Sequence, residues 1–166
     1  LTEDELMKIE EAALPGVGTC AMLGTANTMS CLAEALGMSL PGCGLAHAVS
    51  AKKRRIAKQS GRRIVAMVKE DLTPRKIMTR EALRNAIRVS MAMGASTNST
   101  LHLPAIAHEA GIHITLDDFD ELSREIPYLC NIKPSGQYPL SVLELQGVAP
   151  AVMKALERKL DLEQMT

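Results

Sequence analysis

Cys20 is the residue in this sequence whose type and surroundings best suit chemistry. It lies between Gly18 and Gly24, and glycines allow the backbone to approach a bulky group closely. A helix is expected to begin soon after it, and the N-terminus of a helix stabilises an anion such as a thiolate. A thiolate is the form of cysteine that binds soft metals and iron–sulfur clusters. The residues alone leave two interpretations open: a metal or cluster ligand whose sulfur faces a cleft or the surface, and a buried structural thiol.

Two groups of polar residues also lie where helices are expected to begin. Thr25 and Asn27 either order the loop that carries Cys20 or cap the helix after it. The segment Ser96-Thr97-Asn98 precedes another helix, so its hydroxyls and the helix N–H groups can bind a substrate carboxylate. The same segment can equally be an N-cap with no other role. The basic run 52–55 offers a phosphate site, although such a run is more typical of a solvated helix face.

The remaining cysteines and the histidines are expected to play no part in chemistry. Cys31 and Cys130 fall in apolar stretches and are predicted to be packed thiols, whereas Cys43 lies between two glycines and is looser. No Cys-x-x-Cys pair occurs, which favours a reducing cytoplasm over a secreted disulfide framework. The histidines lack the spacing of a metal site and are read as ordinary helix and surface residues: His47, His102, His108 and His113.

Helices are expected to position these residues. Thr2 and Glu5 form a capping box that opens a helix ending near Ala13. Apolar residues spaced i, i+3, i+4, i+7 predict two further amphipathic helices. Their stripes are Met29, Leu32, Ala33 and Leu36, and Leu83, Ala86, Ile87 and Ser90.

The starts and ends of helices can also be predicted in the rest of the chain. The stretch 47–71 is predicted to be helical with a break at Gly61, and Val49, Ile56, Ile64, Met67 and Val68 are expected to share a face. Helices are also expected after Thr73-Pro74, from Thr79 to Gly94, over 98–110, from Thr115 and from Pro150. A strand is expected over 128–132. The pattern predicts a mostly α fold with a few short strands.

Composition excludes several classes of function. The formal net charge is zero, so the basic footprint of a nucleic-acid binder is absent. No apolar run reaches the roughly 18 residues of a membrane span, and no signal peptide is recognised, so a cytoplasmic protein is expected. With 166 residues and 46% hydrophobic residues, the chain suffices for one modest domain.

Several motifs, in order along nearly the whole chain, resemble the dihydroxy-acid and phosphogluconate (sugar-acid) dehydratase family. They are Gly18-Thr19-Cys20, Gly24-Thr25-Ala26-Asn27-Thr28-Met29, the segment 34–42 (EALGMSLPG), the segment 92–103 (AMGASTNSTLHL), Ala107-His108-Glu109-Ala110-Gly111, and the segment 122–130 (LSREIPYLC). Four positions depart from the family's usual residues: Ala95, Val148, Gln146 and Pro104. A Cβ at a position that needs positive φ would cost about 1 kcal/mol, so loop geometry is in question at the first two.

The resemblance implies a homodimeric hydro-lyase that turns a 2,3-dihydroxy acid into a 2-keto acid with an iron–sulfur cluster and Mg²⁺. It implies that Cys20 is one of three cluster ligands in the intact enzyme. It also implies that residues 1–166 are a single partial domain, an internal segment and the helix-rich part of an α/β domain. The other cluster ligands, the magnesium ligands and the catalytic base would lie outside this segment, so no catalytic residue is assigned within it.

Two questions stay open at this stage. The substrate is either a branched-chain dihydroxy acid or a sugar acid, and Gly18-Thr19-Cys20 with Gly24-Thr25 favours the sugar-acid branch. The chain is either part of such an enzyme or a truncated, non-catalytic module for folding or dimerisation.

Overall fold

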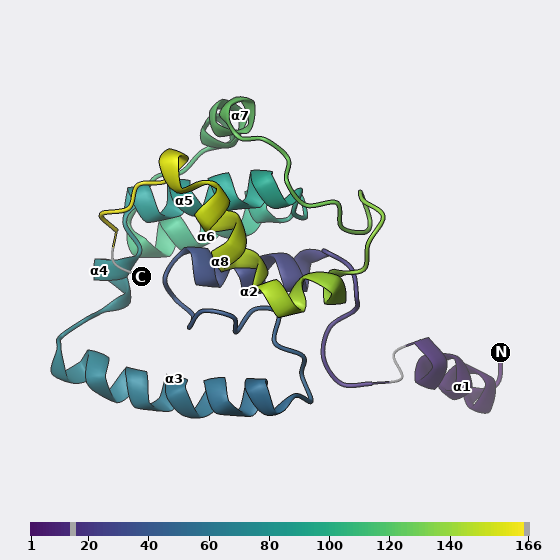
Figure 1. Ribbon diagram of the computed structural model, residues 1–166. Coiled ribbons are helices and arrows are strands. Elements are labelled where there is room, and N and C mark those ends of the chain that lie inside the picture. The colour runs from purple at the N-terminus through teal and green to yellow at the C-terminus, as the bar shows by residue number, and fades with distance from the viewer. Residues whose placement is uncertain (14–15, 165–166) are drawn as a thin grey trace.

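The computed structural model describes residues 1–13 and 16–164, and within them the chain is mostly helical, as the sequence predicts. The centre of the molecule is formed by α2 (Thr25–Ala35), α5 (Arg80–Met93), α6 (Ser99–Ala110) and α8 (Val148–Ala155), which pack on one another (Figure 1). Helix α7 (Leu116–Glu125) packs on α5. Shorter elements complete this part: α4 (Pro74–Ile77) and the 3-10 helices η1 (Leu140–Gln146) and η2 (Glu157–Lys159).

Helix α5 lies at the centre of the core, and its predicted stripe is confirmed. Leu83, Ala86, Ile87 and Ser90 are all buried, as the i, i+3, i+4, i+7 spacing requires. The polar member of this stripe is satisfied, because the Ser90 hydroxyl donates a hydrogen bond to the buried Ser99 hydroxyl at 3.1 Å. The hydrophobic effect of burying this face against α2, α6, α7 and α8 is what fixes the position of α5.

The predicted helix ends are also confirmed. Thr79 caps α5 by accepting a hydrogen bond from the Ala82 N–H at 3.1 Å, and Gly94 ends it with φ of 61°. Gly111 ends α6 in the same left-handed conformation, with φ of 77°, and α6 continues through Pro104. The capping box of Thr115 and Asp118 opens α7.

Three boundaries differ from the sequence-based expectations. The expected strand over 128–132 is replaced by extended loop, and β pairing within the described residues is limited to an isolated bridge between Ile132 and Tyr138. Helix α3 (Ala51–Lys69) runs through Gly61 without a break, because a glycine inside a long helix costs too little to end it. The last helix starts at Val148, two residues before Pro150.

Helices α1 (Glu3–Ala13) and α3 stand apart from this core (Figure 1). The capping box of α1 forms as predicted, but none of its residues is buried. In α3 only Ile56 is buried, while Ile64 and Val68 are 55% and 76% exposed. Val49, which was expected on the same face, precedes the helix, and the apolar face of α3 packs against little within the described residues.

Asp118 gives a test of the α5–α7 contact. It is buried, caps α7 and forms ion pairs with Arg80 and Arg84 at 2.9 and 2.6 Å. Burial raises the pKa of this carboxyl, but the Thr115 backbone hydrogen bond and the two arginines outweigh burial and leave it below its ordinary value of 3.8. A carboxyl whose pKa is lowered on folding stabilises the protein above its unfolded pKa, and this contribution is lost as the pH falls through the folded pKa.

We therefore expect Asp118→Asn to lower the free energy of unfolding at neutral pH by roughly 1–3 kcal/mol. The difference between the variant and the parent chain should shrink as the pH falls below about 4, where the carboxyl of the unfolded chain is protonated. Urea unfolding at several pH values measures this. The matched control is Asp120→Asn, because Asp120 pairs with Arg124 on the exposed side of the same helix and should change stability by less than about 0.5 kcal/mol. A pH-independent effect of Asp118→Asn would contradict the assignment.

Candidate functional site

Cys20 is exposed, as expected for a ligand and not for a structural thiol. It lies on the loop that enters α2 and lines a cavity of about 270 Å³ with Gly18, Asn27 and Lys53. The backbone after it is fixed by two hydrogen bonds from a distant part of the chain. The Leu23 N–H donates to the Lys133 carbonyl at 2.8 Å, and the Leu140 N–H donates to the Ala21 carbonyl at 2.9 Å. The thiol is thus accessible while the loop that carries it is held.

Asn27 holds the Cys20 loop through hydrogen bonds from its side chain. Its side chain is 5% exposed and donates hydrogen bonds to the carbonyls of Cys20 and Met22, at 2.7 and 2.8 Å. The Thr19 hydroxyl donates to its Oδ1 at 2.6 Å. A buried amide that satisfies three groups of one loop fixes that loop, because each bond would leave a polar group unsatisfied if it were lost. These three hydrogen bonds are the means by which Asn27 can order the loop that carries Cys20.

Thr25 lies on the other side of the same helical turn. Successive residues of an α-helix are about 100° apart, so two residues two positions apart point to nearly opposite sides. Thr25 Oγ1 accepts a hydrogen bond from Asn98 Nδ2 at 2.5 Å and lies 3.4 Å from Ser96 Oγ. The Ser96 N–H also donates to the Thr28 hydroxyl at 3.0 Å.

The structure thus divides the predicted site residues into two groups around the start of α2. Asn27 belongs with the Cys20 loop, and Thr25 belongs with the Ser96-Thr97-Asn98 segment, in which Thr97 is exposed. The 96–98 segment does not line the Cys20 cavity. It does lead into α6, and the Ser96 hydroxyl accepts a hydrogen bond from the Asn98 N–H at 3.3 Å. Asn98 directly precedes α6, but its side chain makes no capping hydrogen bond, so the side-chain N-cap expected at this point is not formed.

A second loop, whose position was not predicted from the sequence, borders the Cys20 cavity. Glu34 is buried and accepts hydrogen bonds from the backbone N–H groups of Gly42 and Gly44, at 2.7 and 2.5 Å. A Cβ on Gly44 would lie 2.7 Å from the Ser30 carbonyl oxygen, so this position needs glycine. Lys53 Nζ donates to the Cys43 carbonyl at 2.8 Å and lies 3.5 Å from the Cys43 sulfur. The sequence signals for this loop were the family motif over 34–42 and the glycines on either side of Cys43.

The buried cysteines behave as predicted. Burial, with smaller contributions from Glu34 and Cys130, raises the pKa of the Cys31 thiol to about 12. Burial also raises the pKa of Cys130. Both therefore stay protonated at neutral pH and are unsuited to bind a metal.

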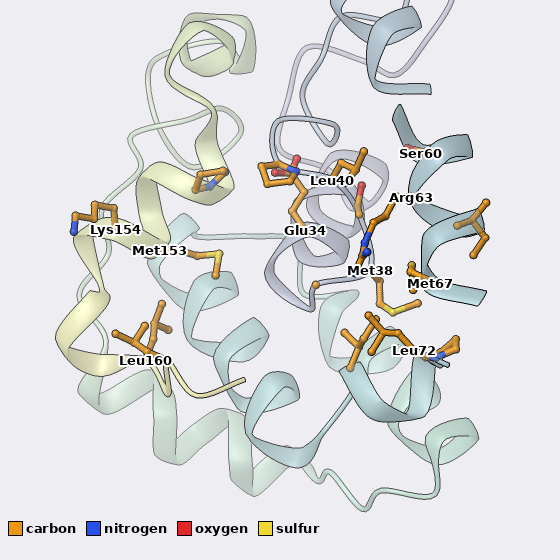
Figure 2. Close-up of a pocket in the computed structure, with 18 of the residues that line it drawn as sticks. Glu34, Met38, Leu40, Ser60, Arg63, Met67, Leu72, Met153, Lys154 and Leu160 are labelled. Carbon is orange, nitrogen blue, oxygen red and sulfur yellow. The ribbon is translucent and has the colours of Figure 1, made fainter. Parts of the chain in front are cut away.

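A larger cavity lies elsewhere. It measures about 760 Å³ and separates α3 from the core, with Met67 and Leu72 on one side and Met153 and Leu160 on the other (Figure 2). Its lining is mostly aliphatic, and none of the predicted site residues faces it. The smaller cavity beside Cys20 is the candidate site, because it combines an accessible thiol with polar groups.

The residues present fit one ligand of a cluster and not a complete site. Cys20 is exposed, and Gly18, with φ of 105°, leaves space that a Cβ would fill by approaching the Ala48 side chain to 2.9 Å. Within residues 1–13 and 16–164, however, no three side chains of His, Cys, Asp or Glu come together as a metal site. A cluster bound at Cys20 would need further ligands from outside the described part of the chain.

The Asn27 contacts predict a measurable effect on the Cys20 loop. Asn27→Ala leaves two carbonyls and one hydroxyl without their partner, so we expect the free energy of unfolding to fall by roughly 2–3 kcal/mol. Backbone amides over 20–23 should exchange with solvent faster in the variant, as hydrogen-exchange mass spectrometry would detect. Asn98→Ala is the control, because its side chain makes one exposed hydrogen bond. Equal exchange of the loop in both variants would show that Asn27 does not hold it.

The fold and the site together define a class of protein: a helical domain in which an accessible cysteine lies on a loop bounded by glycines. The family model described as dihydroxy-acid/6-phosphogluconate dehydratase N-terminal matches residues 1–166, and the chain belongs to this family. The chain is 55% identical over its whole length to a dihydroxy-acid dehydratase of Methanosarcina barkeri and to one of Methanothermobacter thermautotrophicus. It is 52% identical to one of Halothermothrix orenii. It spans about 30% of the length of these curated relatives.

The departures from the family motifs fall where the backbone accepts them. Ala95 and Val148 do not have positive φ, and the neighbouring Gly94 and Gly147 do, with φ of 61° and 65°. Neither residue is therefore placed in the strained conformation that the sequence put in question. Within the described residues, no helix is long and apolar enough to span a membrane.

Proposed function

We propose that this chain is part of a hydro-lyase that converts a 2,3-dihydroxy acid to a 2-keto acid. The observation that carries the proposal is the exposed Cys20 thiol on a held loop, in a chain whose whole length matches the dehydratase family. The relatives named above are dihydroxy-acid dehydratases, which supports a dihydroxy acid as substrate over a sugar acid. The motifs Gly18-Thr19-Cys20 and Gly24-Thr25 favoured a sugar acid instead, so the relatives and these motifs indicate different substrates.

In this proposal Cys20 is one ligand of an iron–sulfur cluster, and Mg²⁺ is bound by groups outside this chain. The cluster supplies a Lewis acid for the hydroxyl that leaves, and the metal ion stabilises charge near the substrate carboxylate. The residues of this chain position these parts. Asn27 and Thr19 hold the cysteine loop, while Thr25 fixes the 96–98 segment, whose hydroxyl and amide groups are proposed to face the substrate.

We further propose that residues 1–166 form a partial domain that does not catalyse the reaction alone, within a cytoplasmic homodimer. Elimination needs a Lewis acid, a group that stabilises the developing anion, and a base for the C2 proton. The candidate site offers one thiol toward the first requirement. The alternative, a non-catalytic module for folding or dimerisation, is favoured by the exposed apolar faces of α1 and α3.

An anaerobic assay separates these possibilities. The chain and a whole protein that contains it are each tested for keto-acid formation from 2,3-dihydroxyisovalerate, gluconate and 6-phosphogluconate. We expect turnover of 2,3-dihydroxyisovalerate by the whole protein and none by the chain alone. Turnover of none of the three acids by a cluster-loaded whole protein would refute the proposed function, and turnover by the chain would refute its partial character.

A further inference from the structure

Cys43 and Lys53 form a close pair of reactive side chains that the proposed cluster site does not use. Lys53 Nζ lies 3.5 Å from Cys43 Sγ and donates a hydrogen bond to the Cys43 carbonyl at 2.8 Å. Cys43 is a free, partly exposed thiol, whereas Cys31 and Cys130 are buried. A partly exposed thiol beside a cationic group is the usual setting of a reactive cysteine. The pair therefore combines an accessible sulfur with a nitrogen nucleophile at contact distance.

The fold holds both partners of this pair in place. The Ser50 hydroxyl caps α3 by accepting from the Lys53 N–H at 3.1 Å, which sets where the lysine side chain leaves the helix. On the other side, Glu34 accepts hydrogen bonds from the backbone N–H groups of Gly42 and Gly44, which flank the thiol. Atoms that are held about 3–3.5 Å apart react as an intramolecular pair, much faster than two free molecules do. The geometry therefore favours a bond between this nitrogen and this sulfur once the sulfur has been oxidised.

We infer that Cys43 and Lys53 form a reversible sulfur–nitrogen crosslink when the protein meets hydrogen peroxide. In the first step the Cys43 sulfur attacks one peroxide oxygen and the O–O bond breaks. The thiol is oxidised to a sulfenic acid, and the peroxide is reduced, with the second oxygen leaving as water. In the second step Lys53 Nζ, as the neutral amine, attacks the sulfur. The N–S bond forms, the S–O bond breaks, and the hydroxyl leaves with a proton from the nitrogen as a second water.

Thiols reverse the crosslink. Two molecules of a small thiol reduce the N–S bond, restore the cysteine thiol and the lysine amine, and are themselves oxidised to a disulfide. The crosslink is therefore a modification that a reducing compartment removes.

The crosslink has a consequence for helix α3. Of the residues of this helix only Ile56 is buried, and a covalent bond from Lys53 ties its first turn to the loop that Glu34 holds. A segment that is tied in this way opens less often. Backbone amides over 51–56 should exchange with solvent more slowly after oxidation and return to their original rate after reduction.

The test treats this chain, without cluster, with hydrogen peroxide and then blocks the remaining thiols with an alkylating reagent. We expect a mass loss of two hydrogen atoms and, after proteolysis, a pair of peptides joined through Cys43 and Lys53 that dithiothreitol separates. Lys53→Arg keeps the positive charge but replaces the amine by a guanidinium that stays protonated, so the joined peptides should be absent. Trapping of the Cys43 sulfenic acid by dimedone should then rise at least about tenfold, because the intramolecular reaction no longer competes.

Two further variants separate the crosslink from other products. Lys52→Arg is the matched control, because it makes the same change at the adjacent residue of the basic run, and it should keep the joined peptides. A disulfide between Cys20 and Cys43 loses the same mass, so Cys20→Ser is treated in parallel and should also keep them. A product that is lost in Cys20→Ser, or oxidation of Cys43 to a sulfinic acid with no joined peptides, would overturn the inference.

The same treatment of the whole protein separates this inference from the proposed function, on which it does not depend. If a cluster-loaded whole protein turned over no dihydroxy or sugar acid but gave the joined peptides, the proposed function would fail and the crosslink would stand. If the whole protein turned over an acid but gave no joined peptides, the inference would fail and the proposed function would stand.

Discussion

On the proposed function, Cys20→Ser in the whole protein is expected to abolish the iron–sulfur absorption and to lower kcat by at least about 1000-fold. A serine hydroxyl is a poor ligand for iron, and a Lewis acid contributes several kcal/mol of transition-state stabilisation, which corresponds to this factor. The change should leave stability nearly untouched, because Cys20 is exposed and its loop is held through its backbone. Anaerobic spectroscopy and a keto-acid assay measure the two effects, and thermal unfolding without cluster measures the third.

Cys43→Ser is the matched control for this substitution. Cys43 is partly exposed and lies on the neighbouring loop, but its sulfur contacts Lys53 and does not line the Cys20 cavity. We expect the Cys43→Ser protein to keep its cluster and most of its activity. A cluster retained in Cys20→Ser and lost in Cys43→Ser would transfer the ligand role to the second loop.

Gly44→Ala is expected to be the most destabilising single methyl added to this site. The new Cβ would lie 2.7 Å from the Ser30 carbonyl oxygen and 2.8 Å from Glu34 Oε1, and the first of these belongs to the backbone of α2 and cannot move aside. We expect a loss of roughly 2–4 kcal/mol in the free energy of unfolding, as for an overpacked core position. The loop must also shift away from Glu34, which accepts hydrogen bonds from the Gly42 and Gly44 N–H groups.

Gly61→Ala tests the same substitution where the structure leaves room. Gly61 lies inside α3 with no atom within 4 Å of its would-be Cβ, so alanine should stabilise the chain by roughly 0.5–1 kcal/mol through helix propensity. Urea unfolding of both variants gives the comparison. A stabilising Gly44→Ala would show that the loop packs differently from the structure described above.

Local signals in the sequence were sufficient for most of the helices. The stripe of α5 and the caps at Thr79, Gly94 and Thr115 depend on residues a few positions apart, so their patterns predicted both the elements and their buried faces. Helix α3 shows the limit of such patterns. The spacing of its apolar residues predicted a helix with an apolar face. Such spacing does not indicate whether another element covers that face.

The candidate site shows the same division between local and distant causes. Cys20 was recognised because its glycines and the following helix are adjacent in sequence. The roles of Glu34 and Lys53 depend on one loop that folds back over α2, and residue types in a single sequence do not specify that contact. The separation of Thr25 from Asn27 was predictable in principle, because a helical turn places residues two apart on different sides. Which residues contact Thr25 and which contact Asn27 could be learned only from the structure.

The backbone bond from Leu140 to Ala21 also sets an order of events during synthesis. Contacts between residues far apart in sequence form late, because a long stretch of chain must be closed before they contribute. The Cys20 loop is synthesised before the segment that holds it, which follows only after α2 to α7 have been made. The thiol therefore stays on an unrestrained loop until Leu140 has been added, and any insertion of a cluster that depends on the final loop geometry has to follow that point.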